Sequence, residues 1–344
     1  MPNRSPVTSA SPLIAPARLM SALPPISFDP WLRQTRWGGR RLETILRKPL
    51  ERHGHYAESW EIADHSQKIS EVTVGPLAGS NLRQLIRQEG RGILGRHAPR
   101  TRFPLLLKFL DANDWLSLQV HPNNQQAVRY SEADSGKTEC WVVISAEPES
   151  EICCGLKKEI DRSAFESAVR SSNFDDVLHR YPVSAGDCIF VPAGILHAIG
   201  PGILLAEIQQ QSDLTFRVHD WDYVDAQGKS RELHVTQAMA CIDFDAGPVN
   251  PIRSVASAGS ATAPEELVNC EFFRILRYTT AEEFNIPDDD QFRILMTLDG
   301  HAELSFDGGT SALTRGQTVL LPASCAGVKV VPGSPITMLK ITLD

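Results

Sequence analysis

The sequence predicts a mainly β protein made of two antiparallel barrels with a few helices. Three observations indicate this fold class. Short apolar runs broken by Gly, Pro and Asp recur along the chain, a pattern typical of strands separated by turns. One strand-and-turn motif occurs twice. The 344 residues, of which 42% are hydrophobic and 22% charged, are enough for two hydrophobic cores of ordinary composition.

Residues 1–27 are predicted to form a disordered tail. They are rich in Pro, Ser and Ala and show little hydrophobic periodicity, so they bury too little apolar surface to offset the entropy cost of folding. They lack the apolar stretch of a secretory signal, and a transit-like role for them stays open. Folded sequence is expected from about Phe28.

Hydrophobic spacing predicts the elements of the first barrel. Alternation of apolar and polar residues indicates a strand at residues 57–63, and helical spacing indicates helices at residues 82–94 and 163–169. Short apolar runs bounded by turn residues predict strands that are buried on both faces. These predicted buried strands are residues 105–109, 140–144, 188–191 and 203–208.

The repeated motif lies at residues 183–193 and 313–323. Each copy has a turn glycine, an apolar strand and a closing proline, and the glycine precedes the proline by six residues in both copies (192 − 186 and 322 − 316). This is the pattern of a small antiparallel barrel of the cupin, or jelly-roll, kind. We therefore predict two cupin-like barrels.

The domain boundaries follow from this repeat and from composition. We predict a catalytic cupin domain with helical insertions at residues 28–245 and a second cupin-like domain at residues 264–344. Residues 246–263 are rich in Ala, Ser, Gly and Pro, which indicates a linker between the two domains.

The two copies of the motif differ where side-chain chemistry would lie. His197 stands five residues past the closing proline of the first copy, and Gly327 stands at the same place in the second. The position that aligns with Glu139 falls near Phe292. Only the first barrel is therefore predicted to carry metal ligands.

His121 and His197 are the first candidates for these ligands. Gln119 lies two residues before His121, so both side chains share one face of a strand. Glu139 enters an apolar strand, and a buried carboxylate needs a metal or another cation as a partner. Imidazole and carboxylate are ordinary zinc ligands, and three protein ligands with an open position indicate a catalytic site.

A dense polar segment follows the predicted strand at residues 203–208. Asp213, Thr215 and Arg217 alternate along it, so they share one face if the segment is extended. Arg217 would then bind a phosphate or stabilise developing negative charge. A surface salt-bridge network is the alternative for Arg217, and Lys137 has the same two interpretations.

Charge and cysteine content limit the partners and the compartment. The net charge of −8 argues against nucleic-acid binding, and an anionic substrate would need a local basic pocket. No apolar run approaches the roughly 20 residues that a membrane helix needs. The seven cysteines are scattered without a CxxC pair, which favours reduced thiols and a cytoplasmic location. The oligomeric state cannot be read from the sequence.

Five motifs in one order carry a family resemblance. They are FPLLLKFLDA at residues 103–112, LSLQVHP at 116–122, GKTECW at 136–141, PAG and HAIG within 192–200, and EIQQ, SDLTFRV and DWD within 207–222. With them, the chain resembles type I mannose-6-phosphate isomerase of the short bacterial kind over about residues 25–344.

The resemblance implies a zinc-dependent aldose–ketose isomerase with one zinc ion per chain. Its reaction interconverts mannose 6-phosphate and fructose 6-phosphate by proton transfer between C1 and C2, through a metal-stabilised enediol(ate). The implied metal ligands are Gln119, His121, Glu139 and His197. Arg217 matches the active-site arginine of the family. The positions that match the lining of the sugar-phosphate pocket are Ser117, Lys137 and Asp213.

Several alternatives stay open from the residues themselves. Asp213 and Lys137 are both candidates for the general base. A cupin oxygenase would use a similar metal set with iron, although basic side chains suit a sugar phosphate better than an apolar substrate. A non-enzymatic sugar-binding protein should have lost a ligand or Arg217. An isomerase of a related aldose would differ only in the shape of the pocket.

Overall fold

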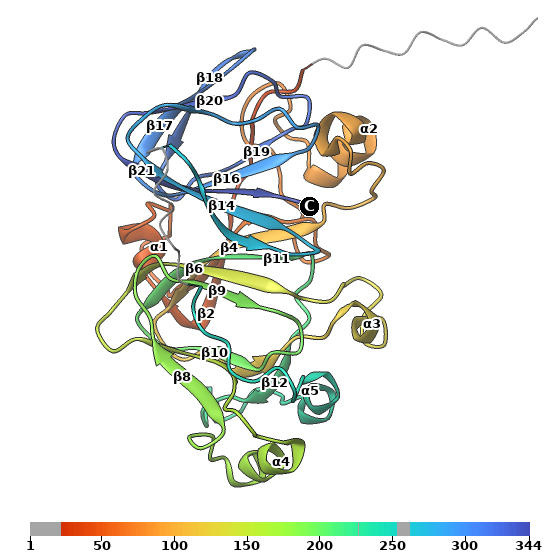
Figure 1. Cartoon of the computed structure of the whole chain (residues 1–344), viewed down its shortest axis with the longest axis vertical. Helices are drawn as coiled ribbons and strands as arrows, with labels where there is room; N and C mark the ends of the chain where they lie inside the picture. The colour runs from red at the N-terminus through yellow and green to blue at the C-terminus, as the bar shows by residue number, and fades with distance from the viewer. Residues whose placement is uncertain (1–21, 226, 253–261) are drawn as a thin grey trace, which may run out of the picture.

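Two β barrels stacked along the long axis of the molecule make up most of the protein (Figure 1). The computed structural model describes residues 22–225, 227–252 and 262–344. Each barrel consists of one six-stranded sheet and one smaller sheet, and all the strand pairs are antiparallel. The predicted fold class, mainly β with two cupin-like barrels, is confirmed.

The first barrel, drawn at the bottom of Figure 1, contains eleven strands in two sheets. Its six-stranded sheet has the order β2 (Trp31–Gly39), β3 (Tyr56–Ile62), β4 (Leu105–Ala112), β11 (Ile203–Gln210), β6 (Glu139–Ala146) and β9 (Cys188–Val191). Its five-stranded sheet has the order β12 (Phe216–His219), β5 (Leu118–Val120), β10 (His197–Ile199), β7 (Glu151–Leu156) and β8 (Leu178–Pro182).

The second barrel, drawn in blue at the top of Figure 1, contains ten strands, one of them from the N-terminal part of the chain. Its six-stranded sheet has the order β1 (Ile26–Ser27), β19 (Thr318–Leu321), β16 (Arg293–Asp299), β21 (Ile336–Thr342), β14 (Arg274–Thr280) and β13 (Glu265–Asn269). Its four-stranded sheet has the order β15 (Phe284–Asn285), β20 (Lys329–Pro332), β17 (His301–Phe306) and β18 (Gly309–Thr314).

The six-stranded sheets of the two barrels pack against each other through one hydrophobic core. Leu107 and Phe109 of β4 belong to this core, and so do Ile294 and Ile341 of the second barrel. All eight residues of β4 are buried, because one face of the strand meets the second barrel and the other lines the first. This arrangement explains why the central strands read as continuous apolar runs.

The helices lie at the outside of the barrels (Figure 1). Helix α2 begins with a capping box between Asn81 and Gln84, and its last turn bonds to the second barrel through the carbonyls of Gly92 and Ile93.

The predicted strands and both predicted helices of the first barrel are present at or close to their expected positions. The helices are α1 (Arg41–Thr44), α2 (Leu82–Leu94), α3 (Asn124–Ala127), α4 (Arg162–Ser171) and α5 (Val235–Cys241).

The predicted disorder of residues 1–27 is wrong at the end of that segment. Residues 1–21 lie outside the described residues, but Leu23 and Ile26 are buried. Strand β1 pairs with β19, with Ile26 opposite Leu320. Ile26 on this short edge strand and Leu23 just before it both pack in the core, which adds this segment to the second barrel although its composition resembles a tail.

The start of the predicted linker, residues 246–263, is held against the first barrel. Val249 N donates to Cys154 O at 3.1 Å, and Ile252 N donates to Cys188 O at 2.7 Å. Residues 253–261 of the linker lie outside the described part of the chain. The domain boundaries at residues 28–245 and 264–344 stay predictions.

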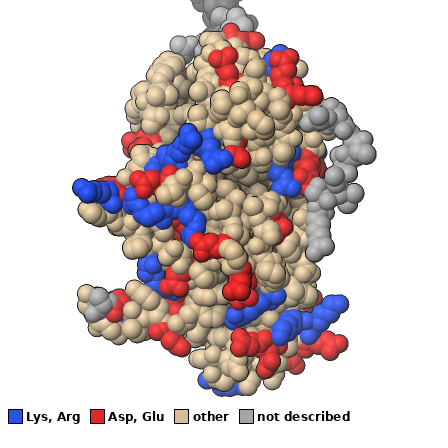
Figure 2. All heavy atoms as spheres, turned by 90° about the vertical axis from the view of Figure 1, so that its left-hand side faces the viewer, with Lys and Arg blue, Asp and Glu red and all other residues tan. Residues whose placement is uncertain are grey.

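The surface carries charges of both signs. On the face shown in Figure 2, Lys and Arg side chains lie among Asp and Glu side chains, so positive charge does not form one continuous surface there. Within the described residues, no helix is both long and apolar enough to cross a membrane.

The second barrel carries an arginine at the position of Glu139. In the strand registers, Glu139 stands opposite Val191 and Arg293 stands opposite Leu321, so Arg293, next to Phe292, takes the place of the carboxylate. Arg293 is fully buried and donates to Cys325 O at 2.6 Å inside the barrel. Phe292 packs in the core between the barrels, with its ring 4.9 Å from that of Phe103. Among the described residues, the only cluster of three or more His, Cys, Asp or Glu side chains suited to a metal lies in the first barrel.

Replacing Phe292 by Ala is expected to lower the free energy of unfolding by about 3–5 kcal/mol, because it leaves a cavity in the core that joins the barrels. Urea denaturation measures this loss. Val331→Ala, which truncates a 37% exposed side chain of the same barrel, should change stability little. Equal losses in both variants would contradict the assigned role of Phe292.

Candidate active site

Strand alternation directs the predicted metal ligands into the first barrel. Glu139 is the first residue of β6, and Trp141, two residues later, lies in the interior core of this barrel. His197 begins β10 and stands directly opposite Gln119 of β5. His121 follows β5, two residues past Gln119, and therefore faces the same way.

The structure brings three of the predicted ligands into contact distance. His121 Nε2 lies 3.6 Å from Glu139 Oε2, and His197 Nε2 lies 3.4 Å from Glu139 Oε1. The three ligand atoms lie within 4.8 Å of one another, and all three residues are buried. Two imidazoles and one carboxylate around a common point are the donor set of a catalytic zinc site with open positions.

Both imidazoles are oriented for metal binding by backbone carbonyls. His121 Nδ1 lies 2.9 Å from Leu214 O, and His197 Nδ1 lies 2.9 Å from Ile195 O. A carbonyl only accepts, so each Nδ1 carries the proton and each Nε2 presents its lone pair to Glu139. Burial holds the pKa of His121 well below its usual range and lowers the pKa of His197 to about 4. Both rings are therefore neutral at neutral pH, as metal ligands must be.

Glu139 provides the test of whether a cation fits. Both of its carboxylate oxygens are buried; Oε1 has no hydrogen-bond donor among the described residues, and Oε2 meets the ammonium group of Lys137. Burial raises the pKa of this carboxyl, although the ammonium group of Lys137, at 2.7 Å from Oε2, opposes the shift. A buried carboxylate that faces two unprotonated ring nitrogens needs positive charge, and the residues present therefore fit a metal ion.

Gln119, the fourth predicted ligand, lies beside this cluster. Its Nε2 is 3.3 Å from His197 Nε2, and its Oε1 accepts a hydrogen bond from Ser117 Oγ at 3.1 Å. The amide thus links the predicted metal site to a predicted substrate-binding hydroxyl. A half-turn of the amide would exchange its two ends and direct the carbonyl oxygen towards the cluster.

A cavity of about 420 Å³ lies in front of the metal cluster. Five of the eight predicted site residues line it: Ser117, Gln119, Lys137, Asp213 and Arg217. The other three, His121, Glu139 and His197, are directly behind Lys137 and Gln119, which contact them. The structure therefore brings all eight predicted residues together, and their roles stay predictions.

A buried lysine in this cavity was not predicted from the sequence. Lys108 of β4 is 3% exposed, and its Nζ lies 3.3 Å from Glu207, 3.4 Å from Asp213 and 3.8 Å from Glu58. Burial alone would lower the pKa of Lys108, but these carboxylates outweigh burial and raise it. A lysine inside an otherwise apolar strand was the signal available in the sequence, because a buried ammonium group needs partners.

Asp213 is an ionised carboxylate in the cavity wall. Burial alone would raise its pKa, but the positive charges of Lys108 and Lys137 outweigh burial and lower it. Gln67 Nε2 also donates to its Oδ2 at 3.1 Å. The side chain is therefore charged at neutral pH and able to accept a proton.

Arg217 of β12 reaches the cavity from the small sheet. Its Nη1 donates to Glu232 O at 2.8 Å, while its Nε is buried without a partner among the described residues. Burial and the nearby Arg231 lower the pKa of the guanidinium group. None of the ion pairs of the described structure includes Arg217, which contradicts the alternative of a surface salt-bridge network.

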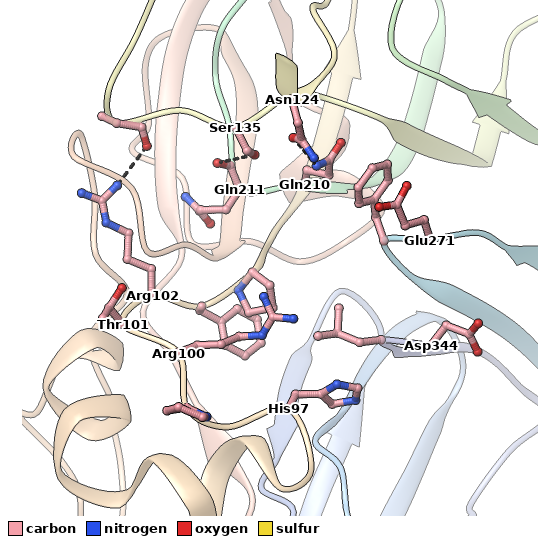
Figure 3. Close-up of a pocket in the computed structure, with 16 residues that line it drawn as sticks. His97, Arg100, Thr101, Arg102, Asn124, Ser135, Gln210, Gln211, Glu271 and Asp344 are labelled. Atoms are coloured by element: carbon pink, nitrogen blue, oxygen red, sulfur yellow. Dashed lines mark hydrogen bonds between the residues drawn. The ribbon is translucent and has the colours of Figure 1, made fainter. Parts of the chain in front are cut away.

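A second and larger cavity, of about 810 Å³, lies between the two barrels (Figure 3). Arg100, Asp344 and Gln211 are among its lining residues, and none of the eight predicted site residues lines it. Ser135 Oγ donates to Gln211 O at 3.2 Å in the lining of this cavity (Figure 3). The candidate active site is therefore identified by the side chains that line the smaller cavity, and not by cavity size.

Comparison with known proteins identifies two family matches in this chain. The family described as phosphomannose isomerase type I, catalytic domain, matches residues 27–154, and the one described as mannose-6-phosphate isomerase, cupin domain, matches residues 264–334. The mannose-6-phosphate isomerase of Streptococcus mutans is 34% identical over 300 residues, which cover 87% of this chain and 92% of that protein.

Solved structures show the same architecture. The crystal structure of mannose 6-phosphate isomerase from Bacillus subtilis matches with a TM-score of 0.84 and 28% identity, and the match covers 92% of this chain and 99% of that chain. A mannose 6-phosphate isomerase bound with zinc and yttrium shares the fold, with a TM-score of 0.72 and 16% identity over 93% of this chain and 99% of that chain. The protein therefore belongs to the type I phosphomannose isomerase family.

Proposed function

We propose that this protein is a zinc-dependent aldose–ketose isomerase that interconverts mannose 6-phosphate and fructose 6-phosphate. The observation that carries the proposal is the buried cluster of His121, Glu139 and His197 behind a cavity with charged walls. Family membership supports this reaction over the oxygenase and sugar-binding alternatives, and the relative from Streptococcus mutans bears the name of the same enzyme.

The proposed zinc ligands are His121, Glu139 and His197, with the carbonyl oxygen of Gln119 as the fourth after a half-turn of its amide. The donor set suits zinc, and a protein of the same fold is described with zinc bound. When bound, zinc supplies a Lewis acid that stabilises negative charge on the substrate oxygens.

Asp213 is the proposed general base. In the aldose-to-ketose direction, the proton on C2 moves to the carboxylate of Asp213 and then to C1, while the hydroxyl proton on O2 moves to O1. Both carbons exchange oxidation levels within one molecule, so no external oxidant is needed. Asp213 is ionised and lines the cavity, so its carboxylate is in the form that takes up a proton from a bound substrate.

Lys137 is better placed to stabilise charge than to act as the base. Its ammonium group lies 2.7 Å from Glu139 Oε2 and 3.2 Å from His121 Nε2, so its protons already face acceptors. In this position it offsets the negative charge that develops on the substrate in the cavity. Ser117 and Arg217 complete the proposed substrate-binding residues.

We also propose a cytoplasmic location. All seven cysteines of the chain are free thiols, and six of them are buried. Proteins of oxidising compartments commonly use such residues in disulfides. The proposed substrate, a phosphorylated sugar, fits the same location.

The test is isomerase activity on mannose 6-phosphate, measured by coupled detection of fructose 6-phosphate. Activity should disappear after chelation and return when zinc is added. Magnesium added to the chelated protein is the matched control and should restore little, because magnesium prefers six oxygen ligands. A zinc-loaded protein without activity on mannose 6-phosphate would overturn the proposed reaction.

A further inference from the structure

Four residues in the wall of the active-site cavity form a closed ring of hydrogen bonds. His65 Nε2 lies 2.9 Å from Asp134 Oδ1, and the same oxygen accepts from Asp213 N at 3.0 Å. Gln67 Nε2 donates to Asp213 Oδ2 at 3.1 Å, and Gln67 N donates to His65 Nδ1 at 3.2 Å. All four residues line the cavity. The ring therefore connects His65 to both the backbone and the side chain of Asp213, the proposed general base.

The two arms of the ring meet at the imidazole of His65. A backbone N–H donates to its Nδ1, so in the neutral imidazole Nε2 carries the proton and donates to Asp134. Burial alone would raise the pKa of Asp134, but the hydrogen bonds from His65 and from the backbone of Asp213 outweigh burial and lower it to about 2. Asp134 is therefore a charged acceptor at neutral pH, which strengthens the hydrogen bonds that it accepts.

The imidazole is held firmly by the residues around it. His65 is 3% exposed, and its ring lies 5.9 Å from the ring of Trp60, which is fully buried. Asp64, the residue before His65, is also fully buried and accepts from Phe103 N at 2.8 Å. These contacts fix the start of the turn that carries His65 and Gln67, so the ring is attached to the core of the protein.

Asp213 lies beyond the part of the chain that the sheet holds. Strand β11 ends at Gln210, and the N–H of Asp213 donates to a side chain and not to a neighbouring strand. Lys108 and Arg33 also attract its carboxylate, from 3.4 Å and 3.8 Å. A general base must lie within about 3 Å of the proton that it takes, and a displacement of about 1 Å can lower the rate about 100-fold.

We propose that His65 is a positioning residue for the isomerase reaction proposed above, because it holds Asp213, through Asp134 and Gln67, in the orientation that takes the C2 proton of the substrate. His65 acts through these two partners and needs no contact with the substrate. None of the described hydrogen bonds of its ring is made with a proposed metal ligand. The proposal therefore concerns the proton-transfer step and not the binding of zinc.

The first test is His65→Ala in the zinc-loaded enzyme. We expect kcat to fall about 10- to 100-fold because the base is displaced, and KM for mannose 6-phosphate and the zinc content to change little. Exchange of the C2 proton with solvent deuterium should slow with kcat. His97→Ala is the matched control, because it removes an imidazole that binds Gln291 Oε1 at 3.1 Å outside the active-site cavity.

A double-mutant cycle with Asp213→Asn separates positioning from general structural support. In the Asp213→Asn protein the base is absent, so adding His65→Ala should lower the remaining kcat by less than about 2-fold. A general loss of structure would lower kcat by the same factor in both backgrounds. That additive result would overturn the proposal.

Two conservative variants test the arms of the ring one at a time. The amide nitrogen of His65→Gln takes the place of Nε2 and keeps the donor to Asp134, and the amide oxygen of His65→Asn takes the place of Nδ1 and keeps the acceptor for Gln67 N. Each variant should recover part of the kcat that His65→Ala loses. Recovery by neither would contradict a role through these two arms.

The outcomes also separate this proposal from the proposed function. An unchanged kcat in His65→Ala, in an enzyme that converts mannose 6-phosphate, would overturn the positioning role and leave the reaction intact. If the wild-type protein does not convert mannose 6-phosphate, amide hydrogen exchange at Asp213 decides. Faster exchange in His65→Ala than in His97→Ala would support the hold on Asp213 without the reaction, and equal exchange would overturn it.

Discussion

Replacing His197 by Ala is expected to abolish isomerase activity and to lower the zinc bound per chain. His197 Nε2 faces Glu139 Oε1 at 3.4 Å, and the ring is neutral because burial lowers its pKa to about 4. Without it, one imidazole and one carboxylate remain around the site. Loss of an outer-shell partner alone commonly costs 10- to about 100-fold in metal affinity or activity, and loss of a direct ligand should cost more.

Zinc content by atomic emission and turnover in the coupled assay measure the two effects of His197→Ala together. His53→Ala is the matched control, because His53 is an exposed histidine of the same barrel and should leave both quantities unchanged. Circular dichroism and the denaturation midpoint should show that the variant is folded. A folded His197→Ala protein with full zinc content would remove His197 from the ligand set.

Much of the metal site could be predicted from the sequence because strands alternate their side chains. Gln119 and His121 had to share a face, and Glu139 at the start of an apolar run had to enter the barrel. The repeat then showed which barrel carried ligands, since Gly327 replaces the histidine of the first copy. These inferences need only local spacing, and the structure agrees with them.

The charged partners in the cavity could not be predicted in the same way. Lys108 meets Glu207 about one hundred residues later, and only the pairing of β4 with β11 places Lys108 directly opposite Glu207. Because Lys108 has apolar neighbours on both sides in the sequence, it did not stand out from the predicted buried strand. A buried charged residue is recognised by the side chains that surround it in the folded protein. A local sequence pattern does not show which side chains these are.

The end of the cavity that contains Arg217 and Arg231 depends on backbone irregularity. Thr35 lines the cavity because β2 breaks its register with β3, and Arg231 reaches it from a polar segment after β12. Register breaks depend on how whole strands fit together, so alternation cannot locate them. The strand at Ile26 could not be predicted for the same reason, because these two residues form a strand by pairing with β19, where Ile26 stands opposite Leu320.

Replacing Asp213 by Asn is expected to lower kcat by about 10²- to 10⁴-fold, the usual contribution of a general base, with zinc content unchanged. The amide keeps the size of the side chain and its contact with Gln67. It loses the ability to take the proton. Exchange of the C2 proton of the substrate with deuterium in the solvent, followed by NMR, measures this step directly and should slow with kcat.

Lys137→Gln separates the two candidate bases. If Asp213 is the base, Lys137→Gln loses only charge stabilisation and slows proton exchange in zinc-loaded protein less than Asp213→Asn does; the reverse order would assign the base to Lys137. The pH profile gives a second criterion. Lys108 and Lys137 outweigh burial and lower the pKa of Asp213, so the carboxylate stays ionised as pH falls past about 3.9, the ordinary value. Protonation of Asp213 should therefore not limit kcat above that pH. An activity loss near pH 6 that Asp213→Asn abolishes would mean that this pKa is raised, and would contradict the charge environment described here.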